Sequence, residues 1–363
     1  MQPDASPYAG RVQRIRERLP QWSVQGLLVL DMKNIRYLTG FTGSDGALLI
    51  GPDDRILMVD GRYITQAREE SAGFEVHRYP GKTDGLVDVI VRLGPGVIGF
   101  EAQAMTVAAW NALTERLPGV TFRPLQEELE GLRAVKDEEE IAKIAKAASI
   151  ASRAFLDVLA RIRPGMTERD IAADLDDAIR RGGAQEASFP TIVASGENAA
   201  RPHARPQDRA VRAGDLITID FGAVYEGYRS DETCTVALGR ADAKQQRAYQ
   251  VVKEAHDRAM AAIRAGVAGR TIDAAARDWI DRQGFGDAFT HGTGHGVGLD
   301  VHEYPRIASH SQTVLEAGMV VTVEPGVYFP GLWGVRIEDL VAVRPDGCTV
   351  LSKISKELKV IEI

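Results

Sequence analysis

The amino-acid sequence predicts two domains, an α/β domain followed by a domain built from two similar halves. The chain has 363 residues, which is enough for two domains. Over roughly the first 125 residues, strand-like segments alternate with segments of helical periodicity. After residue 130, a helix-and-strand pattern occurs twice, with its helical segment repeated at an offset of 101 residues. These observations predict domains at residues 1–130 and 131–363.

The first domain is predicted to contain a mixed sheet flanked by helices, because its strands and helices alternate. Strand-like composition is found at residues 26–31, 46–51, 55–60, 74–79, 96–101 and 120–125. Helical spacing is found at residues 8–19, 63–71, 84–93 and 106–117. The charged, apolar-poor stretch 126–140 then marks the domain boundary.

The second domain is predicted to begin with a long helix from Asp137 to about Arg163, ended by Pro164 and Gly165. Residues 162–183 then recur as 263–284, and residues 212–228 recur as 316–332. Chance similarity between amphipathic helices is one explanation. We favour two halves related by a pseudo-twofold axis, each contributing a pair of carboxylates to one shared site.

Composition restricts the class of protein. The apolar fraction of 44% and charged fraction of 26% are those of a soluble globular protein. A net charge of −7 argues against a nucleic-acid partner, and no apolar run is long enough to span a membrane. The start of the chain lacks the apolar core of a secretory signal. The two cysteines, Cys234 and Cys348, form no disulfide framework, so we expect a cytoplasmic protein.

Four acidic residues and one histidine stand in five segments of the second domain, each next to glycine or inside a β-branched run. They are Asp220 in ITIDFG, Asp231 in RSDETCT, His295 in HGTGHGVGLDVHE, Glu324 in VTVEPG and Glu338 in GVRIED. An acidic side chain in an apolar strand is costly unless it is paired or binds a metal. This hard, oxygen-rich set suits two Mn²⁺ or Co²⁺ ions, with Zn²⁺ also possible, about 3.5–4 Å apart.

The other histidines of the second domain fall into two groups. His291 and His302 lie in the same glycine-rich segment as His295, and His203 lies in a proline-flanked loop. Each of these three could be a solvated loop residue if considered alone. His256 and His310 have no motif around them, and we expect both at the surface.

The ordered segments DFG, SDxT, GTGHGVGLDVHE, EPGVY and RIED resemble those of the metallopeptidases that cleave Xaa-Pro bonds, namely prolidase and aminopeptidase P. Residues 34–50 and 59–67 resemble the N-terminal domain of the same family, so the resemblance covers nearly the whole chain. It implies a creatinase-like α/β N-terminal domain with a mixed sheet. It also implies an α+β pita-bread catalytic domain with an internal pseudo-twofold duplication.

The resemblance also implies roles for the five metal-binding residues. Asp220 would bind one ion, Asp231 and Glu338 would bridge both, and His295 and Glu324 would complete the other. Glu324 would also accept the proton of the attacking water. Cys234 is a departure, because this family often has Arg at that position.

Three histidines and two arginines complete the implied site. His203 and His302 would stabilise the tetrahedral intermediate and deliver a proton to the leaving proline nitrogen, and His291 would lie beside the proline pocket. Arg306 falls where prolidases hold an Arg for the carboxylate of a dipeptide, and Arg336 could serve the same purpose.

Four alternatives remain open on the sequence. We favour a dipeptidase that cleaves Xaa-Pro dipeptides. The first alternative is an aminopeptidase P, which would act on longer peptides. Methionine aminopeptidase lacks the N-terminal domain, creatinase works without metal, and non-catalytic pita-bread binding proteins have lost the ligands. The family resemblance further implies a homodimer in which residues 59–63 reach the partner's active site.

Overall fold

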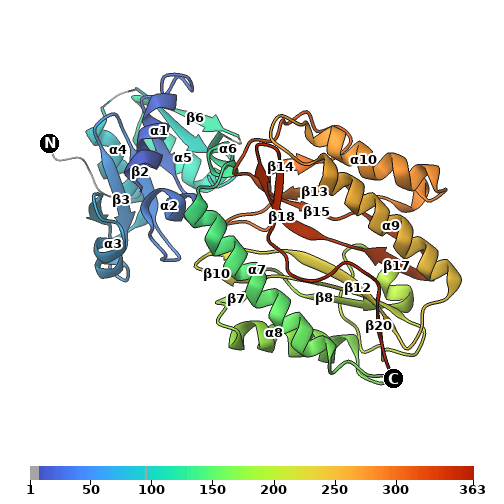
Figure 1. The fold of residues 1–363 in the computed structure, drawn as a ribbon. Helices are drawn as coiled ribbons and strands as arrows, with labels where there is room; N and C mark the ends of the chain where they lie inside the picture. The colour runs from blue at the N-terminus through green and yellow to red at the C-terminus, as the bar shows by residue number, and fades with distance from the viewer. Residues whose placement is uncertain (1–7, 95, 127) are drawn as a thin grey trace. The chain divides into compact units, whose positions relative to one another are not determined.

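The computed structural model describes residues 8–94, 96–126 and 128–363, and the chain forms two compact units, Met1–Glu130 and Gly131–Ile363 (Figure 1). Each unit has its own sheets and core, and each is described by itself below. Within the described residues, no helix is long and apolar enough to cross a membrane.

The first unit contains a six-stranded sheet in the order β4-β3-β2-β1-β5-β6. The strands are β1 (Gly26–Val29), β2 (Ala47–Ile50), β3 (Arg55–Val59), β4 (Glu75–Arg78), β5 (Gly96–Glu101) and β6 (Val120–Leu125). Strand β2 is antiparallel to both neighbours, whereas the other pairs are parallel. The predicted mixed sheet is therefore confirmed.

The helices of this unit are α1 (Ala9–Arg18), α2 (Met32–Thr39), α3 (Ile64–Glu70), α4 (Lys82–Arg92), α5 (Val107–Arg116) and α6 (Glu128–Ala134), which runs into the second unit. The sequence did not predict α2, an eight-residue helix that is capped at both ends. The carboxylate of Asp31 accepts a hydrogen bond from the Lys33 amide at 2.7 Å, and Gly40 ends the helix with a φ of 79°. Helix α6 falls in the charged stretch that we expected to mark the domain boundary.

The second unit begins with α7 (Glu138–Leu159), which is capped at Asp137 as the sequence predicts. Asp137 and Glu140 form a reciprocal capping box, which satisfies the free amide groups at the start of the helix. The helix ends at Leu159, a few residues before the expected end. Its apolar face is buried and includes Phe155, whose ring stacks on Phe221 at 4.8 Å.

The internal duplication is visible in the backbone. Helices α8 (Glu168–Arg181) and α10 (Gly269–Arg282) keep the offset of 101 residues, and α7 corresponds to α9 (Ala243–Ala262). Each half also has the same short bridge before its second helix, Thr167 to Ala210 in one and Ala268 to Val314 in the other. In Figure 1, the pair α7 and α8 and the pair α9 and α10 lie at separate ends of this unit. The predicted pseudo-twofold arrangement is confirmed.

Each half has its own sheet and apolar core. The first sheet has the order β20-β12-β9-β8 and contains β8 (Ile192–Ser195), β9 (Leu216–Phe221), β12 (Glu232–Leu238) and β20 (Lys359–Ile361). The second has the order β14-β13-β15-β18-β19 and contains β13 (Gly294–Gly296), β14 (Glu303–Ile307), β15 (Val320–Val323), β18 (Asp339–Arg344) and β19 (Gly347–Val350). Helices α7 and α8 pack on the first sheet, and α9 and α10 pack on the second.

Two smaller sheets complete this unit. One has the order β11-β10-β7 and contains β7 (Glu186–Ala187), β10 (Ala223–Tyr225) and β11 (Tyr228–Arg229). The other pairs β16 (Gly326–Phe329) with β17 (Trp333–Arg336). The hairpin of β16 and β17 carries Arg336 to strand β12 of the first sheet, where its amide donates to the Thr235 hydroxyl at 3.1 Å.

The expectation for His256 was wrong. His256 lies in α9 and is only 3% exposed, with its Nε2 atom 3.1 Å from the carboxylate of Asp339. The local sequence gave no sign of this, because Asp339 lies in a strand more than 80 residues further along the chain. His310 is exposed, as expected.

Candidate metal centre

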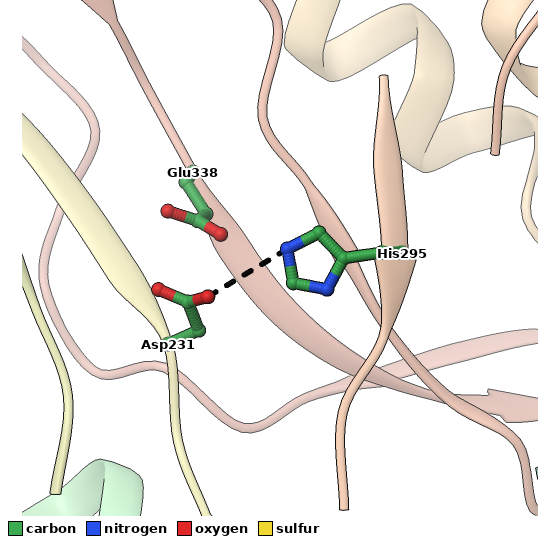
Figure 2. Close-up of side chains that lie close together, drawn as sticks. All are labelled: Asp231, His295 and Glu338. Carbon is green, nitrogen blue, oxygen red and sulfur yellow. Dashed lines mark ion pairs between the residues drawn. The ribbon is translucent and has the colours of Figure 1, made fainter. Parts of the chain in front are cut away.

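Three of the five predicted metal-binding residues come together at the ends of strands. Asp231 directly precedes β12, Glu338 directly precedes β18, and His295 lies in β13. One ligand atom from each lies within 4.8 Å of the others, and Figure 2 shows the three side chains pointing toward one another. The strand ends are joined directly, because the Glu338 amide donates to the Thr233 carbonyl at 3.1 Å. The Thr233 hydroxyl also donates to Glu338 at 2.6 Å.

Glu324 reaches the same point from the end of β15. Its carboxylate lies 3.2 Å from Nε2 of His295, and Asp231 lies 3.7 Å from the same nitrogen. The other ring nitrogen of His295, Nδ1, is 3.0 Å from the carbonyl oxygen of Gly296, which can only accept. In the neutral imidazole, Nδ1 therefore carries the proton, and the lone pair of Nε2 faces the carboxylates. This is the arrangement in which histidine binds a metal.

Asp220 lies in β9, opposite Thr233 of β12. One carboxylate oxygen accepts a hydrogen bond from Arg336 at 2.7 Å. The other is buried and has no hydrogen-bond partner among the described residues. A buried carboxylate oxygen without a partner is costly, and a bound cation would remove that cost.

The charges of the site are unbalanced without cations. Burial, and then the neighbouring carboxylates, raise the pKa values of Asp231 and Glu338 well above their usual range. Burial also raises the pKa of Asp220, and the nearby Arg336 only partly offsets this. Burial alone would raise the pKa of Glu324, but when His295 is protonated its hydrogen bond and charge lower the pKa of Glu324 to about 2. Divalent cations therefore fit this oxygen-rich set.

Three further histidines were predicted for the site, namely His203, His291 and His302. The pKa values of His291 and His302 are both lowered. Partial burial lowers the pKa of His302, whose ring centre lies 4.3 Å from that of His295. Burial also lowers the pKa of His291, and the charge of His203 adds to the lowering at both His291 and His302. His203 is exposed on its loop. Of the three imidazoles, His302 is placed directly beside the metal-binding residues, through its ring contact with His295.

His291 is held by a chain of hydrogen bonds that the sequence did not predict. Its Nδ1 atom lies 2.8 Å from the carbonyl oxygen of Gly292 and therefore donates to it. Its Nε2 atom then accepts from the Tyr328 hydroxyl at 2.9 Å, and the Tyr328 oxygen accepts from Arg336 at 3.0 Å. Tyr328 follows EPG in the EPGVY segment, so the signal for it was present but was not used.

The two predicted substrate-binding arginines differ in what they contact. Arg336 is 4% exposed, and each guanidinium nitrogen already donates, to Thr233, Pro202, Tyr328 and Asp220. Arg306 is exposed and pairs with His295 across β13 and β14, so the two side chains share one face of the sheet. No acceptor contacts its guanidinium among the residues that the structure describes.

Two buried acids on corresponding helices hold the loops that carry the histidines. Glu168, at the start of α8, accepts from Ser195, Asn198 and Gln207, which lie on both sides of His203. In the other half, Asp273 of α10 accepts from the amide and the hydroxyl of Thr293, at 3.1 and 2.8 Å. Sequence reasoning missed both acids, because each appears as an ordinary polar residue of an amphipathic helix.

Comparison with known protein families identifies this architecture. Residues 142–345 match the model of metallopeptidase family M24, and residues 11–135 match the Creatinase/Prolidase N-terminal domain. The chain belongs to metallopeptidase family M24. As a member of this family, it is a metal-dependent peptidase.

Relatives within the M24 family match over nearly the full length of the chain. An Xaa-Pro dipeptidase of Pyrococcus furiosus is 34% identical, over 96% of this chain and 99% of its own. The structure of an Xaa-Pro dipeptidase from Bacillus anthracis is 39% identical with a TM-score of 0.95, covering 98% of this chain and 100% of its own. The X-Pro aminopeptidase of Thermotoga maritima MSB8 is 36% identical with a TM-score of 0.89, over 97% and 99%.

Proposed function

We propose that this protein hydrolyses the peptide bond that precedes proline, and that two divalent ions in the metal centre support the reaction. The observation that carries the proposal is the convergence of buried carboxylates on the Nε2 lone pair of His295. The substrate class is supported by the similar proteins, which are named as Xaa-Pro dipeptidases and as an X-Pro aminopeptidase.

The five residues would divide between the two ions in this proposal. Asp231 and Glu338 would hold both ions, Asp220 would hold one, and His295 and Glu324 would hold the other. Mn²⁺ and Co²⁺ suit such a set best, and Zn²⁺ is an alternative. When bound, the ions lower the pKa of water and polarise the substrate carbonyl.

The protein side chains then handle the protons. Glu324 accepts the proton of the attacking water, and its carboxylate lies in the centre, 3.2 Å from Nε2 of His295. The leaving ring nitrogen must receive a proton as the peptide bond breaks, because an unprotonated amine anion is a poor leaving group. His203 and His302 stabilise the tetrahedral intermediate and supply that proton.

The leaving proline is expected to lie against His291, which Tyr328 and Arg336 hold in place. Arg336 has no nitrogen left for substrate, so we assign it to positioning rather than to binding. Arg306 is exposed beside His295 and carries a charge that lowers the pKa of His302, so it can pair with the carboxylate of a dipeptide. This favours a dipeptidase.

The second candidate function is an aminopeptidase that removes one residue from longer Xaa-Pro peptides. It is favoured by the similarity to the X-Pro aminopeptidase of Thermotoga maritima. The test compares hydrolysis of an Ala-Pro dipeptide, an Ala-Pro-Ala tripeptide and an Ala-Ala dipeptide by the metal-loaded enzyme. A dipeptidase prefers Ala-Pro, an aminopeptidase prefers the tripeptide, and comparable cleavage of Ala-Ala would contradict the proline requirement.

We also propose that the protein is a cytoplasmic homodimer. Both cysteines are free, which suits a reducing compartment. Arg62, in the segment predicted to reach the partner, is largely exposed and is held by Asp60 at 2.8 Å. Sedimentation analysis tests the dimer, and a fully active monomer would contradict it.

A further inference from the structure

A second set of buried charges lies behind the proposed bridging ligands. Successive residues of a strand point to opposite faces, so Glu232 and Asp339 point away from the side that Asp231 and Glu338 occupy. Glu232 and Asp339 are both buried. One ammonium group, that of Lys356, contacts both of them, at 2.5 Å from Glu232 and 3.4 Å from Asp339.

Lys356 comes from the C-terminal segment, beyond the last predicted metal ligand. Strand β20 runs parallel to β12 and carries this segment along the first sheet. The Tyr249 hydroxyl donates to the Lys356 carbonyl oxygen at 3.0 Å, and the Ile354 amide donates to the Glu232 carboxylate at 3.2 Å. The position of the ammonium group is therefore set by the backbone on both sides of it.

Each of the two acids also contacts one further side chain. The Ser152 hydroxyl donates to the second carboxylate oxygen of Glu232 at 2.7 Å, and His256 contacts Asp339 at 3.1 Å. The side chains of Lys356 and Glu232 are only 5% and 2% exposed. A buried ion pair contributes little net stability, but removing one partner leaves an uncompensated buried charge. Loss of Lys356 would leave two such carboxylates beside the acids of the metal centre.

Lys356 connects the starts of two strands, β12 and β18. Glu232 begins β12 in the first half, and Asp339 begins β18 in the second half. A single cation between them links the two strand starts, and the residues that directly precede these starts are Asp231 and Glu338. The distance between the proposed bridging carboxylates therefore depends on this link as well as on the hydrogen bonds from Thr233.

We propose that Lys356 is a positioning residue for the metal centre. By holding Glu232 and Asp339 together, it fixes the spacing of Asp231 and Glu338 and so sets the affinity for the second ion. The inference rests on the proposed function for the assignment of those two residues as bridging ligands. It adds a residue outside the five-ligand motif, from a segment with no predicted role.

The test measures Mn²⁺ binding to metal-free protein by calorimetry, so it needs no substrate. Lys356→Met should weaken binding of the second ion by about 10- to 100-fold, the usual effect of losing a group that orients metal ligands. Lys359→Met is the matched control, because it removes the same charge from an exposed position in the same segment. It should bind both ions as the wild type does. A folded Lys356→Met protein with wild-type affinity for both ions would overturn the proposal.

Two more variants distinguish a change in metal affinity from a loss of folding. Asp339→Asn keeps the ion pair of Lys356 with Glu232 but removes the ion pair that holds β18 to Lys356. It should therefore also weaken binding of the second Mn²⁺ ion. Wild-type binding by folded Asp339→Asn protein would count against the proposal. Lys356→Arg keeps the charge and should retain more affinity than Lys356→Met.

The binding measurement also separates this inference from the proposed function. A wild type that binds two ions but cleaves no Xaa-Pro peptide would refute the function and leave the role of Lys356 intact. A wild type that cleaves Xaa-Pro peptides, with metal affinity unchanged in Lys356→Met, would keep the function and refute this role.

Discussion

At the scale of single residues, the bridging carboxylates should be the least replaceable. Asp231→Asn and Glu338→Gln each remove a charge that both ions share. Because metal ions contribute several kcal/mol to stabilising the transition state, kcat/KM should fall by roughly 100-fold or more. Metal analysis should show that the second ion is lost. Asp208→Asn, an exposed site, is the control, and two bound ions in either ligand variant would contradict the bridging role.

Arg306 tests the choice between dipeptidase and aminopeptidase. A charge-assisted hydrogen bond contributes about 1.5–3 kcal/mol, so Arg306→Ala should raise KM for Ala-Pro by roughly 10- to 150-fold. Binding of Ala-Pro-Ala should hardly change, because its proline carries no free carboxylate. The control is Arg282→Ala, at an exposed position on α10. Equal losses on both substrates would assign Arg306 to a role other than carboxylate recognition.

The candidate site could be predicted from sequence because its members carry their own local signals. Each of the five metal-binding residues stands in or beside a strand that is otherwise apolar, where an unpaired charge is costly. Their roles remain predictions. The positioning roles of Arg336 and Lys356 could not be found in this way, since each depends on a carboxylate more than 100 residues away in the chain, Asp220 for Arg336 and Glu232 for Lys356.

At the scale of secondary-structure elements, helix α8 should control the loop that carries His203. Glu168→Gln weakens the hydrogen bonds that hold the loop on both sides of this histidine. If His203 acts only on the transition state, kcat should fall while metal content stays unchanged. The matched control is Asp208→Asn, which breaks an exposed ion pair between the same loop and Arg169 of the same helix. Loss of metal from Glu168→Gln would contradict a role confined to the loop.

The fold of the elements was largely predictable, with informative exceptions. The strands of the first unit lie where they were predicted, because apolar runs bounded by polar residues give a strong signal. Helix α2 was missed because it is short and depends on a tertiary contact, in which Glu101 accepts hydrogen bonds from the Asp31 amide and Asn34. His256 was wrongly expected at the surface because its burial depends on Asp339 of another element.

At the scale of the whole molecule, the proposed metal centre takes its residues from both halves of the catalytic unit. Asp220 and Asp231 come from the first half, and His295, Glu324 and Glu338 come from the second. Ions that bind only the folded state should add about 2.7 kcal/mol of stability at 100 times their Kd. Chelation should therefore lower the melting temperature, and Mn²⁺ should restore it.

The same measurement on Asp231→Asn provides the control for the effect of metal on stability. Mn²⁺ should raise the melting temperature of this variant much less, because the asparagine side chain lacks the negative charge with which Asp231 would bind the ions. A wild-type melting temperature that is the same with and without bound metal would contradict the idea that the ions connect the two halves.

The central claim is that two ions in one site enable hydrolysis before proline. The most direct measurement titrates the metal-free enzyme with Mn²⁺ while recording the rate of Ala-Pro hydrolysis. The rate should be negligible without metal and should reach its maximum when two ions are bound per chain. Full activity in metal-free enzyme, or no Ala-Pro hydrolysis when two ions are bound, would contradict the account.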